Sequence, residues 1–229
     1  MSIALITGSN KGIGKEISRQ LVKQGFYVFM TGRDLAKVKQ AQEEIDPELN
    51  NSMAIQVDVC DEQQIRIAAE RISAIKGKVD VLVNNAGIIG SYSGFSTLSS
   101  DELEKVISTN ALSVFKMIKV FTPLLLKSKT GRIINLSTGM SVLDELNSSY
   151  LSYRLSKVML NALTIMAANE LASSGIGVYA VDPGWVKTDM GGSSAPLSVE
   201  QGADTVVWLA QGGKAESGRL YRRRKKIDF

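Results

Sequence analysis

Short apolar runs alternate with longer amphipathic stretches along the whole chain, and this alternation restricts the possible folds more than any other feature. The apolar runs predict buried strands at residues 2–7, 26–31, 53–57, 79–83, 132–136 and 176–181, with a further strand at 219–221. The amphipathic stretches predict helices at residues 12–24, 34–45, 61–75, 99–127, 150–173 and 199–210. Alternating strands and helices indicate a parallel sheet with helices on both faces. We therefore expect an α/β fold, a single doubly wound (Rossmann) domain over residues 1–229 with a mostly parallel seven-stranded sheet.

The 229 residues include no histidine and only one cysteine, Cys60. This composition excludes Ser-His-Asp and Cys-His catalysis and every histidine-ligated metal site, so no metal is expected. A lone cysteine cannot form an internal disulfide, and the first residues carry no basic leader, which together indicate a cytoplasmic protein. No apolar run reaches the roughly 18 residues of a membrane-spanning helix, so no membrane partner is expected.

Five positive charges cluster at residues 222–226 of a chain whose net charge is only +4. Such a cluster can be a nucleic-acid or anionic-membrane patch, or it can be a solvated tail. Neither an aromatic platform nor a recognition-helix pattern accompanies it. We therefore expect a solvated tail and no nucleic-acid partner.

Residues 7–14, T-G-S-N-K-G-I-G, follow the first predicted strand and open the first predicted helix. Glycines allow a backbone to turn tightly and approach a pyrophosphate, and the helix start offers free N–H groups to it. The spacing differs from G-x-G-x-x-G, and a plain tight turn is the alternative. The position directly after the first strand favours a dinucleotide site. Its candidate residues are Gly8, Ser9, Asn10, Lys11, Gly12, Ile13 and Gly14.

The end of the second predicted strand bears on the choice of cofactor. An NAD enzyme usually has a carboxylate there, which accepts hydrogen bonds from the ribose hydroxyls. This chain has Thr31, Gly32 and Arg33 instead, and Lys11 in the glycine turn can reach the same place. Two cations suit a 2′-phosphate and predict NADP(H) as the cofactor. Asp34 is the carboxylate that follows, and we assign it to the cap of the next helix.

Polar and small residues also end the third and fourth predicted strands. Asp58, followed by Val59, can accept a hydrogen bond from an adenine amino group, although a cap or turn role explains it equally well. The sequence N-N-A-G at 84–87 combines small residues that permit close approach to a cofactor with amides that can join neighbouring loops. A structural turn is the alternative. The candidate cofactor residues here are Asp58, Val59, Asn84, Ala86 and Gly87.

Asn110 falls on the apolar face of the helix predicted at 99–127. A buried amide costs about 1–3 kcal/mol unless its hydrogen bonds are made. The side chain is therefore either a satisfied core amide that bridges two backbones or a polar group directed into an active site. The pattern favours neither interpretation.

Hydroxyl and amine side chains gather later in the chain. Ser137 and Thr138 end the fifth predicted strand, where a substrate should lie, although both residue types are also common in turns. Tyr153 and Lys157 are four residues apart on the inward face of a helix. A nearby ammonium favours tyrosinate, so we expect Lys157 to lower the pKa of Tyr153 from about 10 towards neutrality and provide a general acid without histidine. A surface Tyr–Lys pair is the alternative.

Taken in order, these motifs resemble those of the short-chain dehydrogenase/reductase family over nearly the whole chain. The matching segments are T-G-x-x-x-G-I-G at 7–14, N-N-A-G at 84–87, Asn110, Y-x-x-x-K at 153–157 and P-G at 183–184. Within the family, N-K at 10–11, G-R-D at 32–34 and P-G-W-V-K-T-D-M at 183–190 look most like the NADPH-dependent carbonyl reductase branch.

The resemblance implies roles for individual residues. Asn110 would hold a water in a proton relay, and Tyr153 would donate the proton to the carbonyl oxygen. Lys157 would lower the pKa of Tyr153 and bind the nicotinamide ribose. The implied contacts to the cofactor include Tyr153, Lys157, Pro183, Val186 and Thr188.

Thr138 stands where the family has its catalytic serine, so the resemblance implies that Thr138, and not Ser137, supplies the catalytic hydroxyl. Its additional methyl group stiffens χ1 and would narrow the substrate range. Segments 139–152 and 187–197 would enclose the substrate. Apolar side chains at Leu143, Trp185 and Met190 give this site an apolar character.

Together these features predict an enzyme that reduces an aldehyde or ketone to an alcohol by hydride transfer from NADPH. Its catalytic residues would be Asn110, Thr138, Tyr153 and Lys157. An NADP-binding regulatory or signalling protein on the same fold, with little turnover, is the alternative. The expected partner is a small-molecule carbonyl substrate, and the two long predicted helices could also pair subunits in a homo-oligomer.

Overall fold

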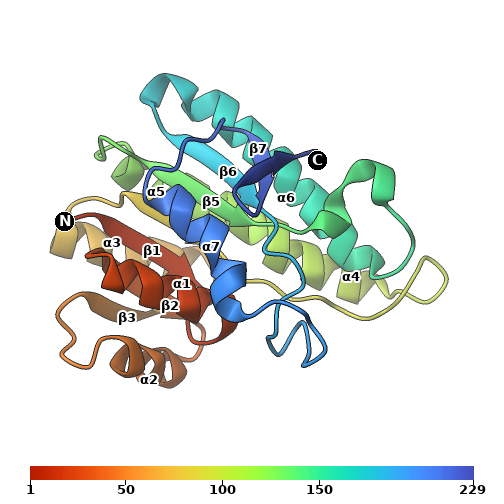
Figure 1. Cartoon of the computed structure of the whole chain (residues 1–229), viewed down its shortest axis with the longest axis horizontal. Coiled ribbons are helices and arrows are strands. Elements are labelled where there is room, and N and C mark those ends of the chain that lie inside the picture. Colours follow the sequence, from red (N-terminus) through yellow and green to blue (C-terminus); the bar gives the residue numbers. More distant parts are fainter.

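The computed structural model describes every residue from 1 to 229, and one eight-stranded sheet runs through it (Figure 1). The strands lie in the order β3-β2-β1-β4-β5-β6-β7-β8, and all neighbouring pairs are parallel except β7 and β8. Their bounds are β1 Ile3–Thr7, β2 Tyr27–Gly32, β3 Ser52–Gln56, β4 Val81–Asn84, β5 Arg132–Leu136, β6 Gly177–Val181, β7 Arg219–Arg222 and β8 Lys225–Ile227. The predicted doubly wound, mostly parallel sheet is confirmed, with one short strand more than the seven expected.

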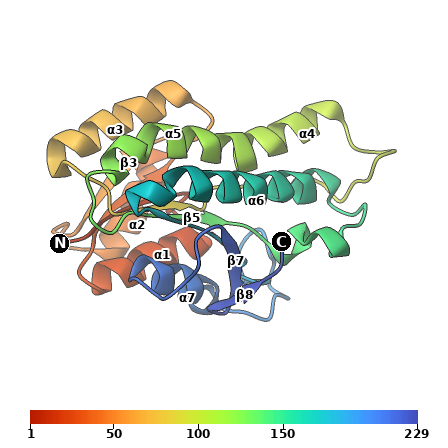
Figure 2. The same ribbon diagram turned by 90° about the horizontal axis from the view of Figure 1, so that it is seen from above.

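Helices cover both faces of this sheet. Their bounds are α1 Gly12–Lys23, α2 Leu35–Ile45, α3 Glu62–Lys76, α4 Ser100–Ile107, α5 Ser113–Leu125, α6 Leu151–Leu171 and α7 Val199–Ala210. Successive side chains of a strand point to opposite faces, so Ala4 and Ile6 of β1 pack with α1, α2 and α7, whereas Ile3 and Leu5 pack with α3, α5 and α6 (Figure 2). None of the helices, including the 21-residue α6, has an apolar stretch that would cross a membrane.

The single helix expected at 99–127 is interrupted by a π-helical turn. α4 ends at Ile107, α5 begins at Ser113, and the residues between them form the turn η1 Ser108–Leu112. Asn110 lies within η1 and is fully buried. Single π-turns inside α-helices are frequent at functional sites.

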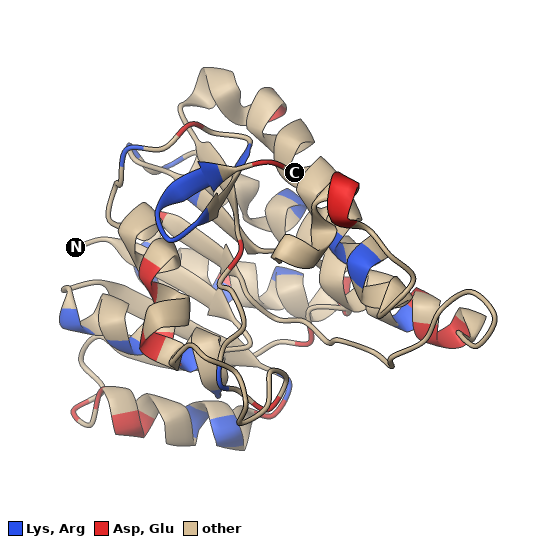
Figure 3. Ribbon diagram, turned by 45° about the vertical axis from the view of Figure 1, so that its right-hand side comes forward, with Lys and Arg blue, Asp and Glu red and all other residues tan.

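The basic cluster at 222–226 is exposed to solvent, as expected, but it forms part of a β-hairpin and not a free tail (Figure 3). Arg223 and Arg224 join β7 to β8 and both adopt left-handed backbone conformations, with φ of 51° and 61°. Two central residues with positive φ give a tight turn that matches the twist of a hairpin. Ion pairs fasten the hairpin to the rest of the chain: Arg222–Asp182, Arg224–Asp204 and Lys226–Glu216.

Candidate active site

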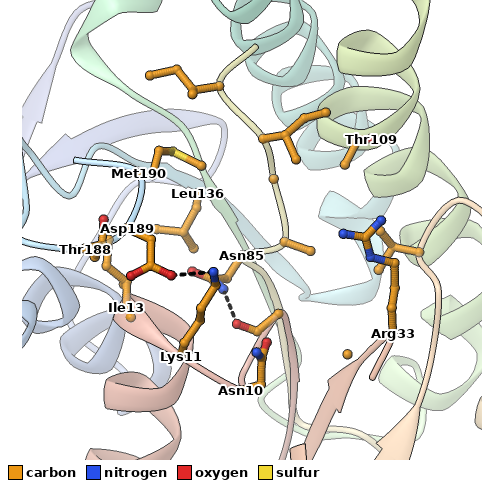
Figure 4. A pocket seen from close by; sticks show the side chains of 18 of the residues that line it. Asn10, Lys11, Ile13, Arg33, Asn85, Thr109, Leu136, Thr188, Asp189 and Met190 are labelled. Atoms are coloured by element: carbon orange, nitrogen blue, oxygen red, sulfur yellow. Dashed lines mark hydrogen bonds and ion pairs between the residues drawn. The ribbon is translucent and has the colours of Figure 1, made fainter. Parts of the chain in front are cut away.

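A cavity of about 880 Å³ lies beyond the carboxyl ends of the parallel strands (Figure 4). The order of the strands reverses between β1 and β4, and open α/β sheets bind ligands at such a point. Fourteen predicted cofactor residues line the cavity, namely Gly8, Asn10, Lys11, Gly12, Ile13, Arg33, Asp58, Val59, Ala86, Gly87, Tyr153, Lys157, Pro183 and Thr188. Six other predicted site residues lie outside its lining: Ser9, Gly14, Asn84, Asn110, Thr138 and Val186.

The glycine turn between β1 and α1 brings a helix start to the cavity without side chains in the way. Gly8 and Gly12 both have positive φ, at 64° and 55°. A Cβ on Gly14 would lie 2.4 Å from both the Gly8 carbonyl oxygen and Asn85 Nδ2, so only glycine fits there. Ser9 is buried and donates its hydroxyl to the Thr31 carbonyl, which holds the turn against β2. The turn therefore fits the pyrophosphate of a dinucleotide.

Asn85, which was not among the predicted site residues, joins the turn after β4 to the glycine turn. Its Nδ2 donates to the carbonyl oxygens of Thr7 and Gly8 at 2.8 and 3.0 Å. The Thr7 hydroxyl in turn accepts from the backbone N–H groups of Asn85 and Ala86. Asn84 instead donates its Nδ2–H to Asn135 Oδ1 of the adjacent strand β5 at 2.8 Å, and its own Oδ1 is buried and unpartnered. Asn84 thus has a structural contact and does not line the cavity.

The two cations expected to bind a 2′-phosphate both line the cavity but differ in their present partners. Arg33 lines the cavity at the end of β2, is exposed, and makes no ion pair. Lys11 also lines the cavity, but its ammonium is 2.6 Å from the Asp189 carboxylate on the opposite loop (Figure 4). Asp34 accepts from the Lys37 N–H, as predicted for the cap of α2. The free cation at this end of the cavity is therefore Arg33.

The turn interpretation of Asp58 is confirmed, whereas its hydrogen bond to an adenine amino group stays a prediction. The residue lines the cavity, and its Oδ1 accepts a hydrogen bond from the Cys60 N–H at 2.9 Å, which is a turn contact. Val59 lies in the same lining and is 7% exposed. The end of β3 therefore presents a carboxylate and an apolar side chain to the cavity.

The Asn110 side chain fastens the loop after β4 to α6. Its Oδ1 accepts from the Ile88 N–H at 2.8 Å, and its Nδ2 donates to the Ile88 carbonyl at 2.8 Å and to the Ser156 hydroxyl at 2.9 Å. The amide is therefore satisfied and bridges two elements, which is the first of the two interpretations left open by the sequence. Gly87 lies close by, since a Cβ there would be 3.1 Å from Asn110 Oδ1 and 3.7 Å from Lys157 Nζ.

Tyr153 and Lys157 are both buried on the inner face of α6 and both line the cavity. Lys157 donates to the Leu136 carbonyl at 2.6 Å, and its Nζ is 5.7 Å from the centre of the Tyr153 ring. Burial raises the pKa of Tyr153 to about 12, with a further rise from the Asp182 carboxylate and an opposing effect of the Thr138 hydroxyl. Burial also lowers the pKa of Lys157 to about 8.

The expectation that Lys157 lowers the pKa of Tyr153 towards neutrality is therefore wrong for this structure. The ammonium donates to a backbone carbonyl, and burial of the phenol raises its pKa. The phenol consequently keeps its proton at neutral pH.

Two hydroxyls follow β5 and have different surroundings. The Ser137 hydroxyl is buried and donates to Asn161 Oδ1 at 2.6 Å, with Ser141 Oγ at 3.2 Å. The Thr138 side chain accepts from the Met140 N–H at 3.3 Å and is the hydroxyl that acts on the pKa of the Tyr153 phenol. Ser137 lines the cavity, although its hydroxyl is hydrogen-bonded to Asn161 in the protein interior.

The loop after β6 forms the side of the cavity opposite β2. Thr188 approaches the glycine turn, because a Cβ on Gly12 would lie 3.3 Å from its methyl carbon. Val186 is 4% exposed and packs against Gly202 of α7, so it supports the loop from behind instead of lining the cavity.

Trp185 is 57% exposed and donates its Nε1–H to the Gly191 carbonyl. Met190 adds an apolar side chain to the lining.

Several other lining residues were not predicted. Ile88 and Lys187 follow strands and Leu136 ends one, so their positions near strand ends could have indicated that they line the cavity. Lys105 and Thr109 reach the cavity from α4 and η1, where no strand end marks them.

Comparison with known sequences identifies relatives over most of the chain. A family model described as short chain dehydrogenase matches residues 2–196. The chain is 37% identical over 188 residues to the 3-oxoacyl-(acyl-carrier-protein) reductase FabG of Staphylococcus aureus, an alignment that covers 82% of this chain and 75% of the relative. It is 32% identical to the (+)-neomenthol dehydrogenase of Arabidopsis thaliana, with 99% of this chain and 97% of that protein covered.

Solved structures with the same fold include two carbonyl reductases. The carbonyl reductase Sniffer of D. melanogaster superposes with a TM-score of 0.92 at 27% identity, covering 100% of this chain and 99% of the other. The NADPH-bound carbonyl reductase from chicken fatty liver gives a TM-score of 0.91 at 26% identity, covering 100% and 94%. With the family match over residues 2–196 and relatives above 30% identity, the chain belongs to the short-chain dehydrogenase family of oxidoreductases.

Proposed function

We propose that this protein reduces an aldehyde or ketone to an alcohol with NADPH, and that Tyr153 is the general acid. The observation that supports the proposal most directly is the position of the Tyr153 phenol. It is buried at the cavity, and Lys157 Nζ lies 5.7 Å from the centre of its ring. A phenol holds its proton at neutral pH and can donate it to a substrate oxygen that becomes basic, and a nearby ammonium stabilises the phenolate that results.

The cavity also fits the proposed cofactor. The glycine turn leaves room for a pyrophosphate at the start of α1, where a Cβ on Gly14 would collide with backbone. Arg33 at the end of β2 offers an unpaired guanidinium to a 2′-phosphate. Positions 31 and 32 are Thr and Gly, so no carboxylate stands there to accept hydrogen bonds from the ribose hydroxyls. The chicken carbonyl reductase that shares the fold is an NADPH complex. We infer that NADPH is preferred over NADH.

In the proposed reaction, each residue of the site has a different role. When bound, the nicotinamide supplies the hydride. Tyr153 transfers the proton from its Oη to the substrate oxygen, and the Thr138 hydroxyl next to the phenol orients that oxygen. Lys157, held by the Leu136 carbonyl, provides positive charge close to the developing phenolate. Asn110 keeps the loop after β4 in place through Ile88.

The names of the relatives indicate two kinds of substrate, a 3-oxoacyl group on an acyl carrier protein for one and neomenthol, an alcohol, for the other. The exposed apolar side chains of Leu143, Trp185 and Met190 favour an apolar carbonyl compound in either case. A decisive assay follows NADPH oxidation over a panel containing a small aldehyde, a cyclic apolar ketone and a 3-oxoacyl thioester, in parallel with NADH. Tight NADPH binding without turnover of any compound would favour the alternative, an NADP-binding regulatory protein.

Replacing Tyr153 by phenylalanine tests the mechanism directly. The variant Tyr153→Phe removes only the hydroxyl, so we expect NADPH affinity to be retained and kcat to fall by roughly 10²–10⁴-fold, the usual contribution of general acid catalysis. Tyr27→Phe is the matched control, because Tyr27 is a buried tyrosine in the core between β2 and α3. Wild-type turnover in Tyr153→Phe would contradict the mechanism.

A further inference from the structure

One buried arginine makes an unusual set of contacts beside the proposed active site. Arg154 follows Tyr153 on α6, is 8% exposed, and has no carboxylate partner. Its guanidinium donates instead to backbone carbonyls, to Ser149 at 2.8 Å, to Met140 at 2.9 Å and, at 3.5 Å, to Glu145. Burying a charge is costly unless its hydrogen bonds are made. These contacts therefore tie the fixed charge of Arg154 to the segment between β5 and α6.

That segment, residues 139–150, is also held at Ser141, whose Oγ accepts from Asn161 Nδ2 of α6 at 2.9 Å and is 3.2 Å from Ser137 Oγ, but it has few attachments beyond these. It contains only two short 3₁₀ turns, Gly139–Ser141 and Leu143–Glu145, whose backbone bonds are local. Leu143 donates its N–H to the backbone oxygen of Phe229, which brings the last residues of the chain beside the segment (Figure 2). From residue 144 to 149, every hydrogen bond that joins the segment to a helix or strand comes from the Arg154 guanidinium.

The junction with α6 adds a second reason for this arrangement. Tyr150, immediately before the helix, has a left-handed backbone with φ of 49°, which is unfavourable for a bulky residue. Arg154 holds this junction from two sides, because its Nε donates to the Ser149 carbonyl and its backbone N–H donates to the Tyr150 carbonyl. The Tyr150 ring also packs edge-on against Tyr92 with ring centres 4.9 Å apart. The Arg154 side chain therefore supports the junction just before α6, which begins at Leu151, two residues before Tyr153.

We propose that Arg154 is a positioning residue that sets substrate specificity, because it holds residues 140–149 as one wall of the substrate site. This inference rests on the proposed carbonyl reduction. The segment joins Ser137 to the start of α6, where Tyr153 lies, and Ser137 and Tyr153 both line the cavity. Its own residues lie outside that lining, and it carries the exposed apolar side chains of Leu143 and Leu146. Its position therefore determines where the part of the substrate remote from the carbonyl lies. Compact substrates do not reach that wall, whereas bulky ones depend on it for alignment.

The kinetic test compares two substitutions with a matched control. Arg154→Met keeps the length of the side chain without its donors, Arg154→Lys keeps the charge with fewer donors, and Arg71→Met on α3 changes an exposed arginine that has no hydrogen-bonded partner. For Arg154→Met we expect KM for a bulky cyclic ketone to rise about tenfold or more, with an intermediate effect in Arg154→Lys. KM for a small aldehyde and the Kd for NADPH should stay near the wild-type values. Equal losses for both substrates, or none, would overturn the proposal.

A second measurement is independent of turnover. With NADPH present, a glutamate-specific protease should cleave after Glu145 faster in Arg154→Lys than in the wild type, while cleavage elsewhere stays the same. If Arg154→Met does not fold, Arg154→Lys carries both measurements. Unchanged cleavage after Glu145 would overturn the anchoring role whatever the enzyme reduces. Faster cleavage in a protein that reduces no carbonyl would support the anchoring, overturn its link to specificity, and count against the proposed function.

Discussion

The Thr138 hydroxyl lowers the pKa of the Tyr153 phenol, whereas the Ser137 hydroxyl donates a hydrogen bond to Asn161. We expect Thr138→Ala to lower kcat roughly 10²-fold, the usual cost of removing one positioned hydrogen-bond donor, and Thr138→Ser to keep or raise it. Ser137→Ala should cost about 1 kcal/mol of stability with little change in kcat, because it removes a buried hydrogen bond. Steady-state kinetics and thermal melts of the three variants check this. A large loss of kcat in Ser137→Ala beside an unaffected Thr138→Ala would reverse the assignment.

Arg33 is the residue on which cofactor preference depends. Its guanidinium lines the cavity without an ion pair, whereas Lys11 is engaged by Asp189. A charge-assisted hydrogen bond contributes about 1.5–3 kcal/mol, so Arg33→Ala should weaken NADPH binding by roughly 10–100-fold and leave NADH binding nearly unchanged. Lys11→Ala should have the smaller effect. Fluorescence titration of both cofactors measures this, and equal wild-type affinities for NADPH and NADH would refute the argument.

At the scale of the elements, the hairpin β7–β8 is joined to the end of β6 by Arg222 and Asp182. The Asp182 side chain is 3% exposed and that of Arg222 is 45% exposed. Arg222→Met would leave a nearly buried carboxylate without its partner, and we expect a loss of about 1–3 kcal/mol, less than for a fully buried pair. Arg223→Met, in the adjacent turn, has no ion pair to lose and is the control. Denaturant melts should separate the two variants, and equal stability would show that the pair contributes nothing.

The type and order of the elements followed from apolar periodicity, but two local features did not. The π-turn η1 depends on a single extra residue per turn, which leaves the apolar pattern of 99–127 almost unchanged. The hairpin turn uses Arg223 and Arg224 in left-handed conformations, although Asn and Gly are the residues that favour them. Its ion pairs join residues between 10 and 40 positions apart, and such contacts have no signature in local sequence.

For the molecule as a whole, Lys157 makes stability depend on pH. Burial lowers its pKa from 10.5 to about 8 in the folded protein, so between these values the unfolded chain binds the proton and the folded protein does not. Stability from this group therefore rises as pH increases from about 8 to 10.5. Relative to Lys157→Met, the wild type should gain about 1–3 kcal/mol over this range, as measured by denaturant melts. A constant difference across that range would contradict the burial of a titrating lysine. The rise in the pKa of Tyr153 has the opposite sign, but it acts only above about pH 10.

Much of the candidate site could be predicted because parallel strands gather their carboxyl ends at one edge. The glycine turn, Arg33 and the N-N-A-G turn adjoin the cavity for that reason, and the Tyr153–Lys157 pair reaches it from α6. The contacts that needed the structure join distant parts of the chain. Lys11 and Asp189 are 178 positions apart, and Asn85 bonds to residues 77 and 78 positions earlier. The direction of the Tyr153 pKa also needed the structure, because it depends on how completely the phenol is buried.

The hairpin turn at Arg223 and Arg224 has a consequence for how copies of this protein meet. An open sheet ends in a strand whose free N–H and C=O groups can pair with another chain, and such edges promote aggregation. Here the turn folds the chain back so that β8, only three residues long, takes that outermost place. Its exposed Lys225 has no ion pair and would repel the same residue of an approaching copy, whereas Lys226 is paired with Glu216. The sheet therefore ends in a short, positively charged strand, which disfavours pairing with the same strand of another copy.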